Sequence, residues 1–583
     1  MHNINKKLNI SSRCAKSSCA LSALLLVLLF GPQVYAQTNG DVVIITGEDI
    51  SRMQANTMAD VLNHVAGITA GESSVGIHGS YKVKVFLDGR PINDPTSSHG
   101  GINWNLVNLE QVEEIQILRG KGSVRYGQDA SGGVILITTR QVSSLSGHIK
   151  TYGGNLDTGY GSAQVQAKKG AYSAAFSGET EFTQGYRENN DKHRYKAGIK
   201  TTYTHDQDRY ISLGADYLYD TRGLAGFLDH PTPYSRKKTK TTALTAQAQY
   251  LQTTSTTFYN DGYRHNSDVS RDFSQTLRVY ELGEDLSTSS KTGEIGELSY
   301  GAGYRRNWAT GSNLDAQSEE TFSLYGSQRF EKDEFPLFFT LGLRANANTD
   351  FDDTLSPEAK LGYHKETWSL TLAYSASANI PSLYQRYNQS SSTMPNPDLD
   401  IETSDNYSLS WHRDFNKQIS LMGTFFYNQL TDRITYVTGD DGIGQYENFG
   451  EVTYRGGDLA LSWQATEKLS LKASYTYLKA RDEETDLTIP AKSEHKATAD
   501  LYYKASDRLM TVLSSKYVSE AYRDRSNTIV IPDYFLMDAR AEYDLGKIAL
   551  FTEIKNLLNC SYSYADGLPA PPRTWILGMT WDI

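Results

Sequence analysis

Hydrophobic and polar residues follow two different patterns along the chain, one before and one after about residue 145. In the first part the apolar residues form short runs, typical of buried strands, and Asp88-Gly89 is a favoured turn dipeptide after one of them. The expected strands are residues 42–45, 83–87, 115–118 and 133–138.

One helix is expected between the first two of these strands. Thr57 and Asp60 have the spacing of a capping box, and Gly67 supplies a helix stop. Between them, apolar side chains recur at helical spacing on one face, at Met58, Val61, Leu62 and Val65. Residues 41–140 therefore predict a small mixed α/β domain.

From residue 145 onward, apolar and polar residues alternate for more than 400 residues. In 337–345 the odd positions are apolar, whereas Thr340, Gly342 and Arg344 share the other face. The same alternation occurs in 469–477 and in 575–583, and the Trp-bearing apolar face of 575–583 suits contact with lipid. A soluble β-sandwich is the alternative, but it seldom sustains such a pattern with so polar an inner face.

A lipid-facing sheet must close, because an open edge leaves backbone groups unpaired in hydrocarbon. At about 20 residues per strand and connection, the remaining 440 or so residues give roughly 22 strands, a size at which barrels carry a plugged lumen. We therefore predict an all-β transmembrane barrel of about 22 antiparallel strands with an N-terminal mixed α/β plug domain inside the lumen.

The N-terminus has the features of a secretory signal peptide: four basic residues, an apolar run over 20–30 and small residues near Ala36. We expect three segments, a signal peptide at 1–36, a plug at 37–142 and a barrel at 143–583. The net charge of −11 becomes −15 once the signal leaves, which argues against a nucleic-acid partner. Cys560 is then the single remaining cysteine, so no internal disulfide is expected.

Residues 109–138 resemble the closing motif of the plug in the TonB-dependent outer-membrane receptors. The match runs from Leu109 through Arg119-Gly120 to the strand that ends at Thr138. Residues 85–92 are similar to the preceding plug strand, and 379–384, 396–404, 554–559 and 569–583 resemble motifs of the family's barrel. The plug-motif residues singled out are Arg119, Gly120, Tyr126, Gly127, Gly132 and Gly133.

The resemblance implies a monomeric receptor in the outer membrane of a Gram-negative bacterium. Its implied partners are TonB with the inner-membrane energising complex, a metal-chelate ligand and outer-membrane lipid. The sequence has no nucleotide-binding loop and no catalytic motif, so energy must arrive by contact and no enzymatic activity is expected. A passive outer-membrane channel is the alternative of another class.

Four departures from the family pattern matter, and the first is Lys121, which follows Gly120 where proline is usual. Ile77-His78-Gly79 stands where Ile-Arg-Gly is usual, which places the usual charge lock between plug arginines and the barrel in doubt. Ile583 stands where a final aromatic residue is usual. Only residues 37–40 precede the first plug strand, so the TonB box has almost no sequence of its own.

A TonB box adds as a strand to TonB, and the first plug strand has the right apolar character. Two interpretations stay open: the segment peels away to couple with TonB, or it is a plain core strand. The coupling candidates are Asp41, Val42, Val43, Ile44 and Ile45.

Ligand contacts are expected at the plug apex, in 71–76 and 94–104, and beside the barrel motif at 379–384. Plug core is the alternative for Trp104, an ordinary loop residue for His99, and a membrane-girdle tyrosine for the barrel candidates. The candidate ligand contacts are Ser73, Ser74, Asn93, Asp94, His99, Trp104, Tyr384, Arg386 and Tyr387.

A ferric siderophore is the first expected substrate and cobalamin the second. Heme is disfavoured because residues 384–394 contain no histidine. No resident metal or cofactor is expected. The acidic run from Glu179 through Asp191 could hold calcium in extracellular loops, but without ligand spacing a solvated loop is favoured.

Overall fold

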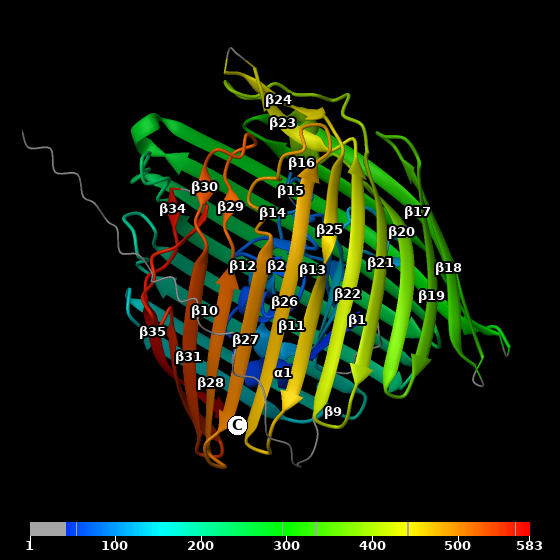
Figure 1. Ribbon diagram of the computed structural model, residues 1–583, viewed down its shortest axis with the longest axis vertical. Helices are drawn as coiled ribbons and strands as arrows, with labels where there is room; N and C mark the ends of the chain where they lie inside the picture. The colour runs from blue at the N-terminus through cyan, green and yellow to red at the C-terminus, as the bar shows by residue number, and fades with distance from the viewer. Residues whose placement is uncertain are drawn as a thin grey trace, which may run out of the picture.

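A closed barrel of 22 antiparallel strands surrounds a smaller domain in its lumen, as the computed structural model shows (Figure 1). The structure describes residues 42–583 except 54, 99, 294, 333–334, 440–441 and 566. The predicted fold class is confirmed. The expected signal peptide, residues 1–36, and Asp41 lie outside the described residues. Among the described residues, no helix is both long and apolar enough to cross a membrane.

Each barrel strand pairs with the next barrel strand in chain order, and β35 pairs with β8 to close the barrel. The strands are β8 (Ser146–Gly154), β9 (Thr158–Lys169), β10 (Tyr172–Thr183), β11 (Lys192–Asp206), β12 (Arg209–Gly223), β13 (Ser235–Tyr250), β14 (Thr253–Asp268), β15 (Phe273–Lys291), β16 (Gly296–Gly311), β17 (Leu314–Lys332), β18 (Phe335–Asn348), β19 (Thr354–Lys365), β20 (Trp368–Asn379), β21 (Glu402–Asp414), β22 (Ile419–Thr431), β25 (Val452–Gln464), β26 (Leu469–Asp482), β27 (His495–Lys504), β28 (Leu509–Val518), β31 (Tyr534–Asp544), β32 (Ile548–Lys555) and β35 (Thr574–Asp582).

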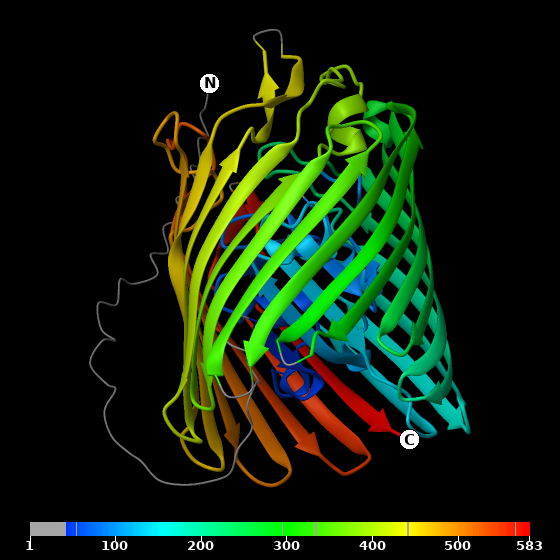
Figure 2. The same ribbon diagram turned by 90° about the vertical axis from the view of Figure 1, so that its right-hand side faces the viewer.

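The two ends of the barrel differ. Short turns join the strands at the end where the C-terminus lies, which we call the turn end (Figure 2). Longer segments join them at the opposite, loop end, where the hairpin β23–β24 rises above the rim (Figure 2). The loop-end elements are α4 (Leu383–Tyr387), η3 (Val269–Arg271), β23 (Ile434–Thr438), β24 (Gly444–Asn448), β29 (Ala521–Tyr522), β30 (Val530–Ile531), β33 (Ser563–Ala565) and β34 (Leu568–Pro569).

The alternating pattern places apolar side chains outside the barrel and polar ones inside it. On β18, Leu341 and Leu343 are about half exposed, whereas Thr340 and Arg344 are buried towards the lumen. The apolar side chains of β35 are likewise exposed. An apolar outer surface on a closed barrel is what a lipid environment requires.

The plug is organised around a five-stranded mixed sheet in the order β1-β6-β7-β4-β5. Of these pairs, only β4 and β7 are parallel. The plug strands are β1 (Val42–Thr46), β2 (Ile68–Ala70), β3 (Val75–Ile77), β4 (Val83–Leu87), β5 (Arg90–Pro91), β6 (Val112–Arg119) and β7 (Gly133–Thr139). All four expected plug strands are present, and the turn at Asp88-Gly89 has positive φ at both residues, as such tight turns require.

The expected helix is α2 (Met58–Asn63), and both hydrogen bonds of the Thr57–Asp60 capping box are formed. It ends earlier than expected, with His64 at the C-cap rather than beside Gly67. The sequence did not predict α1 (Gly47–Met53), α3 (Ser123–Tyr126), η1 (Trp104–Leu106) or η2 (Leu109–Gln111). These are short segments without a full apolar stripe, so packing rather than periodicity determines them.

Ion pairs and hydrogen bonds join the plug to the barrel wall. Among the described residues, nine pairs of a Lys or Arg with a carboxylate cross the interface, each with an N–O distance between 2.7 and 2.9 Å. They are Arg90–Asp216, Arg119–Asp458, Arg125–Asp285, Lys150–Glu110, Lys200–Asp88, Arg222–Glu72, Arg264–Asp94, Lys472–Asp49 and Lys555–Asp60. A polar interface of this kind can be rehydrated pair by pair.

The Asp60–Lys555 pair should make the stability of the plug depend on pH. Although burial opposes it, Lys555 at 2.9 Å lowers the pKa of Asp60 to about 2, from an ordinary value of 3.8. The unfolded plug therefore binds a proton more readily, so the stabilisation is complete above pH 3.8 and is lost as the pH falls through about 2. It amounts to at most about 2 kcal/mol. We expect Asp60→Asn to lower the unfolding midpoint of detergent-solubilised protein at pH 7 but not at pH 2. An equal difference at both pH values would contradict this.

Candidate functional site

Two plug loops meet at the loop end of the lumen. In the turn between β2 and β3 the Gly71 N–H donates to the Ser74 carbonyl at 2.9 Å. The second loop, residues 92–102, folds back on itself, and its Ile102 N–H donates to the Ser73 carbonyl at 2.8 Å. We call the two loops the apex loops. They border an upper cavity of about 280 Å³, whose wall consists of the loop-end parts of β12 to β15.

The upper cavity is lined by mixed charges. Arg222 is paired with Asp220 at 2.9 Å, and Arg264 with Asp94 at 2.7 Å. Lys237 also lines the cavity. Such a surface can bind a polar ligand through side chains that exchange partners when the ligand arrives.

The sequence-predicted plug contacts divide into two groups. Ser73, Asn93 and Asp94 line the upper cavity. The Asn93 amide is already occupied, because it accepts from the Val85 N–H and donates to the Val83 carbonyl, both at 2.8 Å.

Ser74 is partly buried and Trp104 is buried, and neither lines the upper cavity. Trp104 is 6% exposed, packs in the plug core and donates to the Ser74 carbonyl at 3.5 Å. Its position matches the plug-core alternative rather than an open stacking platform. His99 lies outside the described residues.

The barrel candidates Tyr384, Arg386 and Tyr387 lie on α4, which begins with a capping box between Ser382 and Gln385. Arg386 is 1% exposed, donates to Glu319 and stacks over Phe351. The two tyrosines are half-buried against an apolar cluster beneath the helix. These contacts anchor the loop to the wall, and Arg386 is buried rather than presented to the upper cavity.

A second, side cavity of about 340 Å³ lies between the plug and the wall formed by β13 to β18. It shares Asn93, Asp94 and Glu281 with the upper cavity. Its lining runs from Ser97 and Ser382 near the loop end to Gln247 and Thr254 near the turn end. The two cavities therefore follow one side of the plug through most of its height.

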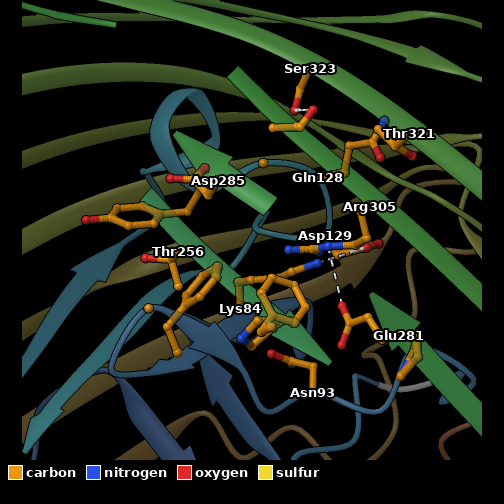
Figure 3. A pocket seen from close by; sticks show the side chains of 18 of the residues that line it. Lys84, Asn93, Gln128, Asp129, Thr256, Glu281, Asp285, Arg305, Thr321 and Ser323 are labelled. Carbon is orange, nitrogen blue, oxygen red and sulfur yellow. Dashed lines mark hydrogen bonds and ion pairs between the residues drawn. The ribbon is translucent and has the colours of Figure 1, made fainter. Parts of the chain in front are cut away.

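Charged side chains from both domains enter the side cavity. Figure 3 shows Lys84 and Asp129 of the plug and Arg305 and Glu281 of the wall gathered around one space. Lys84 lies 3.6 Å from Asp129, and Arg305 lies 3.3 Å from Glu281. Sequence reasoning missed all four residues, because they come from four separate segments with no common motif.

A buried cluster of three side chains joins plug to wall on the opposite side. Asp458 accepts from Arg119 at 2.9 Å and from His78 Nε2 at 2.8 Å, and both Asp458 and His78 have side chains that are 1% exposed. The His78 ring also stacks on Phe426 with 3.8 Å between centroids. We call His78, Arg119 and Asp458 the plug anchor.

The plug anchor corrects the doubt about the charge lock. Arg119 forms it with an aspartate of the wall, and His78 reaches the same carboxylate from the position where the family has arginine. Burial lowers the pKa of His78, so the ring is neutral at pH 7 and Nε2 carries the donated proton. The aspartate charge is then balanced by Arg119 rather than by His78.

The remaining motif residues position this region. Gly120 follows Arg119 with φ +59°, and a Cβ on Gly133 would lie 2.1 Å from the Leu118 carbonyl oxygen. Only glycine fits at Gly133. Gly127 has φ +93°, a Cβ on Gly132 would lie 2.9 Å from the Val83 side chain, and Tyr126 packs against Phe86.

The coupling candidates Val42 to Ile45 form β1, which pairs along its whole length with β6, from Val42 opposite Leu118 to Thr46 opposite Glu114. β1 is an edge strand, so it is paired on one side only. This arrangement fits a core strand in the resting protein, and its edge position means that release of β1 breaks strand pairing with β6 only.

The acidic run from Glu179 through Asp191 is largely engaged by cations. Arg194 contacts Glu179 and Glu181, and Arg236 contacts Asp191, each pair at 2.6 Å. Among the residues that the structure describes, no cluster of three His, Cys, Asp or Glu side chains has the arrangement of a metal site.

The sequence matches two family models and resembles two known proteins over most of its length. Residues 120–557 match the family model "TonB dependent receptor-like, beta-barrel", and residues 36–134 match "TonB-dependent Receptor Plug Domain". The vitamin B12 transporter BtuB of Vibrio cholerae is 24% identical over 94% of each chain. An iron-regulated outer membrane virulence protein of the same species is 24% identical over 94% of this chain and 93% of its own.

Two solved structures share the fold. The ferric enterobactin receptor PfeA of Pseudomonas aeruginosa superimposes with a TM-score of 0.79 at 18% identity, covering 94% of this chain and 100% of its own. The siderophore receptor PirA of the same species gives a TM-score of 0.75 at 20% identity with the same coverage.

Proposed function

The chain belongs to the TonB-dependent receptor family of the Gram-negative outer membrane, and from that premise we propose that it imports a ferric siderophore. The family consists of transport receptors rather than enzymes. The observation that carries the proposal is the pair of connected, charge-lined cavities along one side of a plug that fills the lumen. A ligand too large to diffuse past a plug needs both a binding surface above it and energy to move it.

The second candidate is cobalamin. It is favoured by the relation to the vitamin B12 transporter over nearly the whole length of both chains. The siderophore is placed first because the cationic side chains of the cavities suit the anionic groups by which many siderophores bind iron.

In the proposed cycle the ligand binds in the upper cavity, against the apex loops. TonB then pulls on the N-terminal part of the plug from the periplasm. The polar plug–wall interface allows part of the plug to shift, which widens the passage along the side cavity. The segment pulled must be among the less stable parts of the plug.

Growth of a deletion strain on single nutrient sources tests this function. The strain, with and without the plasmid-borne receptor, is supplied with individual ferric siderophores or with cobalamin as the sole source. We expect the receptor to restore growth on at least one ferric siderophore, and only when TonB is present. Restoration by cobalamin alone would select the second candidate, and growth unchanged on every source would refute uptake.

A further inference from the structure

Two cations of the side cavity, Arg344 and Lys84, lack a close carboxylate partner among the described residues. Arg344 is 8% exposed and donates to Asn346, Ser323 and backbone carbonyls. Within the described part of the chain it has no ion pair with a carboxylate. Lys84 is 7% exposed, and its ammonium makes no hydrogen bond to the described residues; its nearest carboxylate oxygen, on Asp129, is 3.6 Å away.

Two further guanidinium groups face the same space. Arg305 reaches Glu281 at 3.3 Å, outside ordinary hydrogen-bond distance, and Arg125 pairs with Asp285 at 2.8 Å. These four cations, together with Lys82, which also lines the cavity, are opposed there by Asp129, Glu281 and Asp285. The other lining carboxylates are engaged elsewhere: Asp94 with Arg264, Glu284 with Ser255 and Thr257, and Glu319 with Arg386.

Crowding of these cations is costly in the resting protein. Burial, reinforced by the charge of Arg305, lowers the pKa of Lys84 to about 8. Buried charges are ordinarily paired, because an ion removed from water without a counter-ion loses its solvation. A negatively charged group that entered this space would gain charge-assisted hydrogen bonds without displacing an existing strong ion pair of Lys84 or Arg344.

The size of the cavity limits what it can hold. At about 340 Å³ it lies near the lower end of the range for ligand pockets, roughly 300–1,000 Å³. A cavity of this size accommodates one anionic group of a ligand and the atoms next to it. A whole metal chelate is larger, so it fits only if the plug shifts. The side cavity shares Asn93, Asp94 and Glu281 with the upper cavity, so a ligand that leaves the upper cavity towards the turn end reaches the side cavity next.

We propose that the side cavity is a transit site, in which Lys84, Arg305 and Arg344 bind an anionic oxygen group of the ligand as it passes between the plug and the wall. This inference rests on the proposed import function and names the substrate class, an anionic ferric chelate such as a tris-catecholate, in preference to a neutral trihydroxamate. The ligand first binds in the upper cavity, so loss of the transit site impairs passage rather than capture.

Lys84→Met is the principal test, because this ammonium makes no hydrogen bond whose loss would disturb the fold. We expect uptake of a ⁵⁵Fe-labelled ferric tris-catecholate by whole cells to fall about tenfold, the value of one charge-assisted interaction. Binding of the same chelate to de-energised cells should stay within about twofold of the wild type. Lys84→Arg should restore uptake, and Arg305→Gln should reproduce the loss.

Arg209→Gln is the matched control, since Arg209 lies at the turn end, pairs with Asp206 and does not line the cavity. It removes one positive charge and should leave uptake unchanged. Wild-type cells that import no ferric siderophore of any class and no cobalamin would refute the import function itself. Normal tris-catecholate import by the wild type and by Lys84→Met alike would refute the transit site and leave the import function standing.

Selenate tests the site without the chelate. Crystals of the full-length receptor soaked in selenate should show an anomalous peak between Lys84 and Arg344, and crystals of Lys84→Met should lack it. A peak of equal height in both would mark an adventitious ion only and would count against the site. No peak in either would overturn it.

Discussion

Replacing Ile44 with proline is expected to abolish TonB-dependent uptake while leaving binding of the ligand at the cell surface within about twofold of the wild type. Proline lacks the backbone N–H that a strand needs for pairing, and Ile44 lies in the middle of β1, the strand proposed to couple with TonB. The upper cavity is formed by other segments, so capture of the ligand should persist. Uptake and binding of a labelled chelate by the same cells measure the two effects. Uptake equal to that of the wild type would rule out β1 as the coupling element.

A reversible disulfide distinguishes a loss of coupling to TonB from a loss of plug stability. Ile44 and Gln116 are opposite each other on β1 and β6, so Ile44→Cys with Gln116→Cys, in a Cys560→Ser background, can fasten β1 to β6. We expect uptake to cease under oxidising conditions and to return when a reductant is added. Undiminished uptake by the oxidised protein would mean that β1 need not leave β6.

Asp458→Asn is expected to lower the free energy of plug unfolding by about 3–5 kcal/mol. The amide keeps the shape of the side chain but removes its charge, so Arg119 is left buried, at 5% exposure, without the carboxylate that balances it. His78 loses a charged acceptor at the same time. Urea-dependent cleavage of the plug by protease measures the change, while resistance of the barrel to denaturation by detergent confirms that the wall stays folded.

Asp261→Asn is the matched control for this prediction. Asp261 also lies on a wall strand and pairs with an arginine at 2.9 Å, but that arginine, Arg278, has a side chain that is 50% exposed. Exposed ion pairs contribute roughly 0–1 kcal/mol, so the midpoint should barely move. Similar shifts for Asp458→Asn and Asp261→Asn would show that the plug anchor does not hold the plug in place.

The candidate site was only partly accessible to sequence reasoning. The apex loops were recognisable because Ser, Gly and Asn gather between plug strands, and Ser73, Asn93 and Asp94 do line the upper cavity. Arg386 was selected for its nearness to a family motif, yet its partner Glu319 comes from a strand more than sixty positions earlier and holds it buried. Proximity along the chain gives no information about such a partner.

The fold itself was determined by the sequence alone, because a two-residue alternation requires a sheet, an apolar outer face requires lipid, and lipid requires closure. The strand number and the plug strands followed from length and from local patterns of a few residues. Only the tertiary structure decided which charges meet. The plug anchor joins His78, Arg119 and Asp458, and the side cavity joins Lys84, Arg305 and Arg344, from segments hundreds of residues apart. These contacts depend on how the plug is rotated within the barrel, and no periodic pattern in the sequence predicts that rotation.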